Sequence, residues 1–366
     1  MESRVEALAV MRGCCCAGRR AELAAAPAAR AVRPWVVPAG RDETPEVTSW
    51  ETEIDAESGA YNRTRSSYRA APPTSEAGRY VVYGSHACPW ATRVKMLLHM
   101  LGLERAVPYI DCDPVFGIID ERSRRTGWVF SEAYPDPING QSTLRDVYLL
   151  GNPAHASKSS TPMLWDTRDG AVLHNESWEL VPLLHDRFRD HAEHPEVDLL
   201  PAALRPAINE RYQALYEPLL NGVYRAGFAT RQEVLDEVLD AMFETLDALE
   251  ELLSRQRWLL GERFTFADVI TFPTLWRFDF VYAVHFKCSR RRVRDYPALS
   301  AYVREIYSWP LTRRCNLVEQ TRAHYYRSHY TINPHRLVAK VELDWMDAPH
   351  GREALPAAPP HWFMRV

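Results

Sequence analysis

The spacing of hydrophobic positions changes from strand-like to helical between residues 79 and 101. Residues 79–85, RYVVYGS, form a short apolar run rich in aromatic and β-branched side chains, which predicts a strand. From Pro89 the apolar positions recur at helical spacing up to Leu101, and Gly102 marks the end of the predicted helix. AVPYIDC, residues 106–112, predicts a second strand. The chain thus passes from strand to helix and back to strand.

A long polar stretch, residues 113–160, separates these elements from the next ones, and a structureless loop of that length is rare unless it is functional. STPMLWD and AVLHNES then predict strands that are joined by TRDG, a hairpin signal. ESWELVPLLHDRF, residues 176–188, opens a helix. Strand, helix, strand, hairpin and helix together predict a thioredoxin-like domain over residues 79–190.

The following part of the chain shows helical periodicity over residues 204–216, 231–253 and 266–284. Thr265 and Asp268 match a capping box at the start of the last of these helices. We therefore expect an all-helical second domain over residues 198–330. The predicted fold class is α/β plus all-α.

The remaining segments have weaker patterns. Residues 1–45 are rich in Ala and Arg, and they are either a disordered extension or a transit peptide. Residues 46–78 read as a surface arm, and residues 331–366 as a C-terminal tail.

Composition narrows the class of protein. The 366 residues are 46% hydrophobic and 25% charged, with a net charge of −4, so no basic excess points to nucleic acid. No apolar run reaches the roughly 18 residues of a membrane span. The seven cysteines are irregularly spaced, which favours a reducing compartment over a disulfide framework. We expect a cytoplasmic protein, or an organellar one if residues 1–45 are a transit peptide. The run Cys14–Cys16 lacks the two separated pairs that are usual in zinc sites, so no metal is predicted.

Cys88 stands where the first strand gives way to the first helix. A helix N-terminus stabilises a thiolate, and a thiolate is both a nucleophile and a redox group. Ala91 occupies the position of the second cysteine in a Cys-x-x-Cys pair, so a disulfide of Cys88 must form with another molecule. Small thiols such as glutathione are the natural candidates. The alternative interpretation is that Cys88 is only a small buried residue.

Two further stretches carry binding signals. Thr161–Pro162, just before a strand, is a candidate cis peptide, which would leave the backbone of Met163 free to pair with an extended peptide ligand. The alternative is an ordinary trans proline. At Glu176 and Ser177 a strand meets a helix, where N–H groups and a hydroxyl would bind a carboxylate. Alternatively, Ser177 only caps that helix.

Aromatic residues and histidines are less informative from spacing alone. Trp128 lies in the long insert, while Tyr224, Tyr325 and Tyr326 lie in predicted helical regions, where aromatic residues usually belong to the core. A papain-like Cys/His enzyme is conceivable, but the sequence singles out no histidine.

Several stretches, in order, carry a resemblance: SHACPWATR, GWVF, TPMLWD, NES, NGVYRAGFAT, LLGERFTFADV, REIYSWP and HYYRSHYTINP. They resemble the signature stretches of glutathionyl-hydroquinone reductases, the Xi class of glutathione transferases, over residues 46–333. The resemblance implies that Cys88 attacks the sulfur of a glutathionyl-hydroquinone and releases the hydroquinone. A second glutathione then resolves the glutathione–Cys88 mixed disulfide and leaves as glutathione disulfide.

The same resemblance implies site residues. The glutathione site falls on Trp128, Met163, Glu176 and Ser177, with Met163 where the family usually has Val. The hydroquinone site falls on Tyr224 and Tyr325, although the adjacent Tyr326 leaves the second assignment open. Glutathione is then a co-substrate, no cofactor is permanently bound, and the protein is a homodimer. From its charge and hydropathy we expect neither nucleic-acid nor membrane partners.

Two other functions compete with this one. An Omega-like thiol transferase, reducing dehydroascorbate or mixed disulfides, would use the same cysteine chemistry without needing Tyr224 or Tyr325. A non-catalytic glutathione-transferase-like binding module would need none of these residues, so the presence of Cys88 beside both predicted glutathione-binding stretches argues against it.

Overall fold

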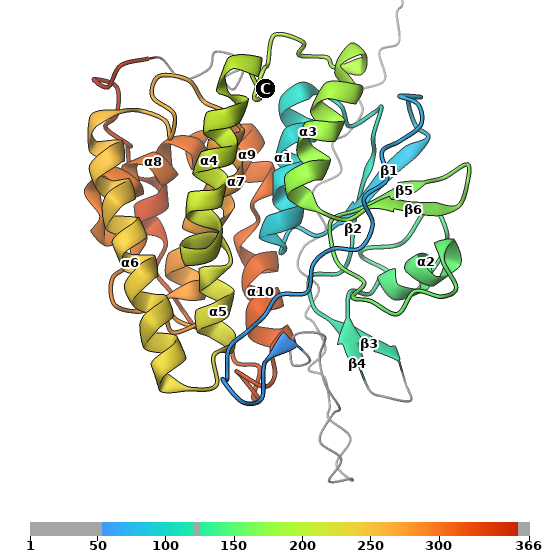
Figure 1. Ribbon diagram of the computed structural model, residues 1–366, viewed down its shortest axis with the longest axis horizontal. Coiled ribbons are helices and arrows are strands. Elements are labelled where there is room, and N and C mark those ends of the chain that lie inside the picture. Colours follow the sequence, from blue (N-terminus) through green and yellow to red (C-terminus); the bar gives the residue numbers. More distant parts are fainter. Residues whose placement is uncertain (1–52, 121–124, 358–366) are drawn as a thin grey trace, which may run out of the picture. The chain divides into compact units, whose positions relative to one another are not determined.

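The computed structural model describes residues 53–120 and 125–357 (Figure 1). These residues belong to one compact unit. Cys14–Cys16 and the predicted extension over residues 1–45 lie outside the described residues.

A four-stranded sheet forms the first part of the fold, with the strand order β2-β1-β5-β6. Its strands are β1 (Tyr80–Gly84), β2 (Tyr109–Asp111), β5 (Met163–Asp166) and β6 (Ala171–His174). β2 runs parallel to β1, whereas β5 and β6 are antiparallel to their neighbours. The first connection is a crossover through a helix and the last is a hairpin, so the predicted thioredoxin-like arrangement is confirmed.

Helices cover both faces of this sheet: α1 (Pro89–Leu101) and α3 (Ser177–Arg187) lie on one face and α2 (Leu144–Gly151) on the other (Figure 1). Successive side chains of β1 alternate between the faces, as the period of a strand requires. Tyr80 and Val82 pack in the cluster that contains α1 and α3, while Val81 and Tyr83 pack in the cluster that contains α2. α1 ends at Gly102, whose φ of 66° lies in the left-handed region that favours glycine.

The insert between β2 and β5 is structured. β3 (Gly117–Asp120) and β4 (Arg125–Gly127) pair as a two-stranded antiparallel sheet, and α2 follows. The Thr143 side chain caps α2 by accepting a hydrogen bond from the backbone N–H of Asp146 at 3.1 Å. The insert therefore supplies the helix that covers the second face of the sheet, which the sequence pattern did not predict.

The second part of the fold is helical. Its α-helices are α4 (Arg205–Leu215), α5 (Gly222–Phe228), α6 (Gln232–Arg255), α7 (Phe266–Arg277), α8 (Pro297–Ser308), α9 (Pro310–Cys315) and α10 (Val318–Ser328). Short 3-10 turns lie at η2 (Arg189–His191), η3 (Ala202–Leu204), η6 (Val293–Asp295) and η7 (Asp344–Asp347). The predicted all-helical character and the capping box at Thr265 and Asp268 are confirmed.

π-Helical segments interrupt two of the expected helices. η4 (Tyr216–Leu220) joins α4 to α5, and η5 (Phe278–Tyr282) continues α7. The helix predicted over residues 266–284 is therefore an α-helix followed by a π-helical turn. Such turns are frequent at functional sites.

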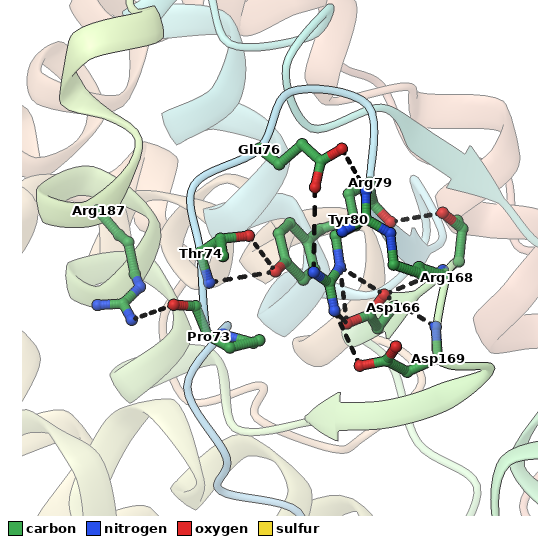
Figure 2. Close-up of polar contacts among 10 residues, drawn as sticks. Pro73, Thr74, Glu76, Arg79, Tyr80, Asp166, Arg168, Asp169 and Arg187 are labelled. Carbon is green, nitrogen blue, oxygen red and sulfur yellow. Dashed lines mark hydrogen bonds and ion pairs between the residues drawn. The ribbon is translucent and has the colours of Figure 1, made fainter.

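Buried ion pairs fasten the C-terminal segment to the helical part and link two strands of the sheet. Arg352, which is 3% exposed and lies in the segment with weak periodicity, donates to Glu305 Oε2 at 2.9 Å, and Arg257 donates to Glu305 Oε1 at 2.7 Å. Directly before β1, Arg79 forms a fork on the fully buried carboxylate of Asp166 at the end of β5, with Nε–Oδ1 at 2.9 Å and Nη2–Oδ2 at 2.6 Å (Figure 2).

Within the described residues, no helix is both long enough and apolar enough to cross a membrane.

Candidate active site

Cys88 is the N-cap residue of α1, and Pro89 is the first residue of the helix. Proline suits this position because its missing N–H would have no intrahelical partner. The carbonyl of Cys88 accepts hydrogen bonds from the backbone N–H and the hydroxyl of Thr92, both at 2.9 Å. Cys88 is 6% exposed, and its thiol lies 3.7 Å from the carbonyl oxygen of Thr161. The predicted strand–cysteine–helix junction is therefore present.

The Thr161–Pro162 peptide bond is cis, as predicted. β5 starts directly afterwards, with Met163 opposite Tyr83 of β1. The Met163 side chain is fully buried and is not among the residues that line the cavities described below. Any contact of Met163 with a ligand therefore has to come from its backbone.

Cys88 lines a cavity whose empty space, including the part open to solvent, is about 820 Å³. Trp128 of the insert and Tyr224 of α5 line the same cavity, so the structure brings together three of the predicted site residues. Glu176 and Ser177 line a second cavity, whose empty space is about 710 Å³ when the part open to solvent is included. The two cavities share Arg63, Trp90, Ser157, Lys158, Ser160 and Thr161, so they adjoin each other, and we call the two together the groove.

The start of α3 lies at one end of this groove. Glu176 is the N-cap residue of α3, and its carboxylate accepts from the backbone N–H of Trp178 at 3.1 Å. Ser177 is the first helical residue, and its hydroxyl accepts from Arg93 at 3.3 Å. The interpretation of Ser177 as the cap is therefore wrong, because the cap is Glu176.

At the other end of the groove, the hydroxyls of three tyrosines lie within hydrogen-bonding distance of one another in a chain. The hydroxyl oxygens of Tyr224 and Tyr325 are 2.7 Å apart, and those of Tyr325 and Tyr282 are 3.1 Å apart. Burial raises the pKa of Tyr224, so its hydroxyl keeps its proton at neutral pH. Tyr325 is 1% exposed and does not line the cavity, so it touches Tyr224 rather than the open space. The Tyr326 hydroxyl donates elsewhere, to the Phe280 carbonyl at 2.9 Å.

Two cations of the groove wall were not predicted. The Arg63 guanidinium lies 4.8 Å from the ring centroid of Trp90 and 4.7 Å from that of Tyr224, and its Nε donates to Asn221 at 2.8 Å. Lys158 pairs with Glu53 at 2.8 Å. Because Arg63 and Glu53 come from the segment read as a surface arm, no local pattern indicated their position in the site.

His324 of α10 was also missed. Its imidazole stacks on Trp128 with ring centroids 4.8 Å apart and an interplanar angle of 11°. Its Nδ1 lies 2.8 Å from the carbonyl oxygen of Pro114. Burial lowers the pKa of His324 to about 3, so the ring is neutral at physiological pH.

Arg277, at the end of α7, contacts the Cys88 segment from the helical part. Its fully buried guanidinium donates to the carbonyl of His86 at 2.9 Å and to the hydroxyl of Thr92 at 3.1 Å. It also donates to the carbonyl of Pro273 at 3.0 Å. Residues on both sides of Cys88 are thus held by one side chain.

No cluster of three or more His, Cys, Asp or Glu side chains in the described part of the chain is arranged to hold a metal ion.

Comparison with known proteins places this geometry in a family. Residues 232–305 match the model "Glutathione S-transferase, C-terminal domain". The chain is 40% identical over 286 residues to glutathionyl-hydroquinone reductase PcpF of Sphingobium chlorophenolicum, an alignment that spans 76% of this chain and 89% of the relative. The chain belongs to the glutathionyl-hydroquinone reductase family, the Xi class of glutathione transferases.

Solved structures of Xi-class proteins have the same fold. The glutathione transferase Xi from Phanerochaete chrysosporium superposes with a TM-score of 0.74 at 35% identity, covering 80% of this chain and 95% of that one. The glutathione-bound structure of YqjG, a glutathione transferase homologue from Escherichia coli K-12, gives a TM-score of 0.72 at 34% identity, covering 78% and 95%. The predicted fold class and the resemblance to Xi-class enzymes are both confirmed.

Proposed function

We propose that this protein reduces glutathionyl-hydroquinones to hydroquinones, with glutathione as the reductant. The observation that carries the proposal is the position of Cys88, at the N-cap of α1 and in a groove that runs from Glu176 and Ser177 to Tyr224. A glutathionyl-hydroquinone has the same layout, with a peptide at one end, a sulfur in the middle and a phenolic ring at the other.

The Cys88 thiolate attacks the sulfur atom of the conjugate, and a Cys88–glutathione disulfide forms as the bond from sulfur to the ring carbon breaks. The bonding electrons stay with the ring carbon, which takes up a proton, and the hydroquinone leaves. A second glutathione thiolate then attacks the glutathione sulfur of the mixed disulfide. Glutathione disulfide departs and the Cys88 thiolate returns. In the net reaction, the proton gained by the ring is the one lost by the second glutathione thiol.

The groove offers partners for both halves of the substrate. We propose that the peptide half contacts Glu176, Ser177, Trp128 and the backbone of Met163. The phenolic half then meets Tyr224, whose hydroxyl donates to a quinol oxygen while Tyr325 orients it through their 2.7 Å contact. A donor that strengthens as charge develops on the ring lowers the barrier.

The assay that tests the proposal supplies the full-length protein with a glutathionyl-hydroquinone and glutathione, and measures both hydroquinone and glutathione disulfide. Cys88→Ser should abolish the reaction, because a serine hydroxyl cannot form the mixed disulfide. Cys315→Ala is the matched control, since Cys315 is buried on α9 and lines neither cavity. Full activity in the Cys88 variant would contradict the mechanism.

Tyr224→Phe separates this function from that of an Omega-like thiol transferase. Loss of the donated hydrogen bond should cost on the order of 1–3 kcal/mol, or about 5- to 150-fold in rate, on a glutathionyl-hydroquinone. Reduction of a small mixed disulfide without a quinol ring should change little. Equal losses on both substrates would favour the Omega-like function.

We also propose that this chain forms a homodimer and uses glutathione as a co-substrate rather than a resident cofactor, as the family relationship supports. We further propose a cytoplasmic location, which the irregular spacing of the cysteines favours.

A further inference from the structure

His324 is a histidine whose tautomer is set by its surroundings. A carbonyl oxygen only accepts hydrogen bonds, so the 2.8 Å contact between Nδ1 and the Pro114 carbonyl requires the proton to be on Nδ1. The Ser328 hydroxyl lies 3.4 Å from the same nitrogen and makes a weaker second contact. The other ring nitrogen, Nε2, therefore carries a lone pair and acts only as an acceptor.

The orientation of this acceptor is also fixed. The His324 ring stacks on Trp128. It also meets Phe116 edge-on, with ring centroids 4.9 Å apart. The residue is 6% exposed, and the space that it lines is the cavity of Cys88 and Tyr224. Burial keeps the pKa of the imidazole near 3, so protonation does not convert Nε2 into a donor at physiological pH.

Nε2 of His324 has no hydrogen-bonding partner among the described residues. A nearly buried acceptor gains most from a ligand that brings a donor. Its nearest ring neighbours on the cavity wall include Trp128 and Phe116, and Phe228 and Tyr224 line the same cavity. The complementary ligand is therefore an aromatic ring that carries an N–H or O–H group.

We propose that Nε2 of His324 accepts a hydrogen bond from a phenolic hydroxyl of the bound ring, and so selects hydroquinones over rings that present only acceptors. This inference rests on the proposed function and deepens it. Tyr224 donates and His324 accepts, which matches the two capacities of a quinol hydroxyl. A quinone carbonyl or an aryl ether would instead place a lone pair against that of Nε2.

The test compares the binding of hydroquinone and of 1,4-dimethoxybenzene to the glutathione-saturated full-length protein, measured by calorimetry. The two ligands share a ring and two oxygens, but only hydroquinone donates. The wild-type protein should bind hydroquinone about tenfold more tightly, a ratio typical of one satisfied buried acceptor. His324→Leu should remove most of this preference, while His324→Gln should retain part of it because the amide oxygen accepts.

His285→Leu is the matched control. His285 is another buried neutral histidine of the same aromatic cluster, and it does not line the cavity, so this variant should keep the wild-type ratio. An unchanged ratio in His324→Leu would overturn the inference. If His324→Leu does not fold, the wild-type protein alone tests the inference, because equal binding of the two ligands by the wild type also overturns it.

The outcome separates this inference from the proposed function. A wild-type protein that turns over no glutathionyl-hydroquinone refutes the proposed function, whatever the binding ratio. A protein that turns over the conjugate but shows no preference dependent on His324 refutes only the role of His324.

Discussion

Arg277 connects the helical part of the fold to the segment that carries the reactive cysteine. We predict that Arg277→Met largely inactivates the protein without unfolding it. The guanidinium donates to the carbonyl of His86, two residues before Cys88, and to the hydroxyl of Thr92, whose own hydroxyl donates to the carbonyl of Cys88. Methionine fills similar space but donates no hydrogen bond.

Two opposing effects set the size of the stability change. Removing the guanidinium leaves the carbonyls of His86 and Pro273 without this donor, at a cost of about 1–3 kcal/mol each. Against this, Arg277 is fully buried, and no carboxylate pairs with it among the described residues, so its charge costs several kcal/mol to desolvate. These effects largely offset each other, and we expect the free energy of unfolding to change by less than about 2 kcal/mol.

The effect on catalysis has no such offset. Displacing a reacting group by about 1 Å costs on the order of 100-fold in rate. We therefore expect kcat for a glutathionyl-hydroquinone to fall about 100-fold, while the KM for glutathione stays near the wild-type value because Arg277 does not line the groove. Arg277→Lys keeps the charge but cannot reach all of the same acceptors, so its kcat should lie between those of the wild type and Arg277→Met.

Steady-state kinetics and urea denaturation of the same protein preparations provide the assay. Wild-type kcat in Arg277→Met would refute the reasoning. So would a loss of stability above about 4 kcal/mol, because unfolding would then account for the lost activity.

Three other expectations follow from the structure. Trp128→Ala should raise the KM for glutathione while circular dichroism shows an intact fold, since Trp128 lines the groove beside Cys88. Glu305→Gln should lower the free energy of unfolding in urea by about 3–5 kcal/mol, because it leaves two buried guanidiniums without their carboxylate. Burial raises the pKa of Asp166, but the hydrogen bonds and charge of Arg79, together with the backbone N–H groups of Asp169 and Arg168, lower it by more, so the net pKa lies below 3.8. A depressed carboxyl pKa gives stability that is present above pH 3.8 and is lost as pH falls below it, and thermal unfolding of Asp166→Asn against pH should lack this acid-dependent loss.

Each of these has a contrary result. Unchanged glutathione kinetics in Trp128→Ala would make the tryptophan a core residue only. A change below about 1 kcal/mol in Glu305→Gln would mean that water reaches the guanidiniums. An Asp166→Asn protein with the same acid profile as the wild type would assign that profile to other carboxyl groups.

What the sequence predicted well is local in the chain. The junction at Cys88, the helix that Gly102 ends and the Thr161–Pro162 turn each depend on residues within a few positions of one another. Apolar periodicity and turn chemistry therefore carry enough information to place them. The resemblance to the family predicted Tyr224 and Tyr325 as site residues. It did not predict that Tyr325 contacts Tyr224 without lining the cavity.

What the sequence did not show depends on contacts between distant segments. α2 is an eight-residue helix, too short for its period to stand out. Arg63 acquires its position from Asn221, 158 residues away, and His324 from Pro114, 210 residues away. The acceptor state of His324 follows from a single carbonyl, and no pattern within α10 contains that carbonyl.

The direction of the Tyr224 side chain depends on the number of residues in the preceding π-helical segment, Tyr216–Leu220. Each residue of an α-helix advances the chain by about 100° around its axis, so deleting one residue from this segment would restore α-helical hydrogen bonding and turn everything after it by about that angle. The Tyr224 hydroxyl would then leave both Tyr325 and the groove while every side chain of the site remained present. In an alignment of relatives, a one-residue gap here would therefore mark a protein that keeps the cysteine chemistry but binds a different ring.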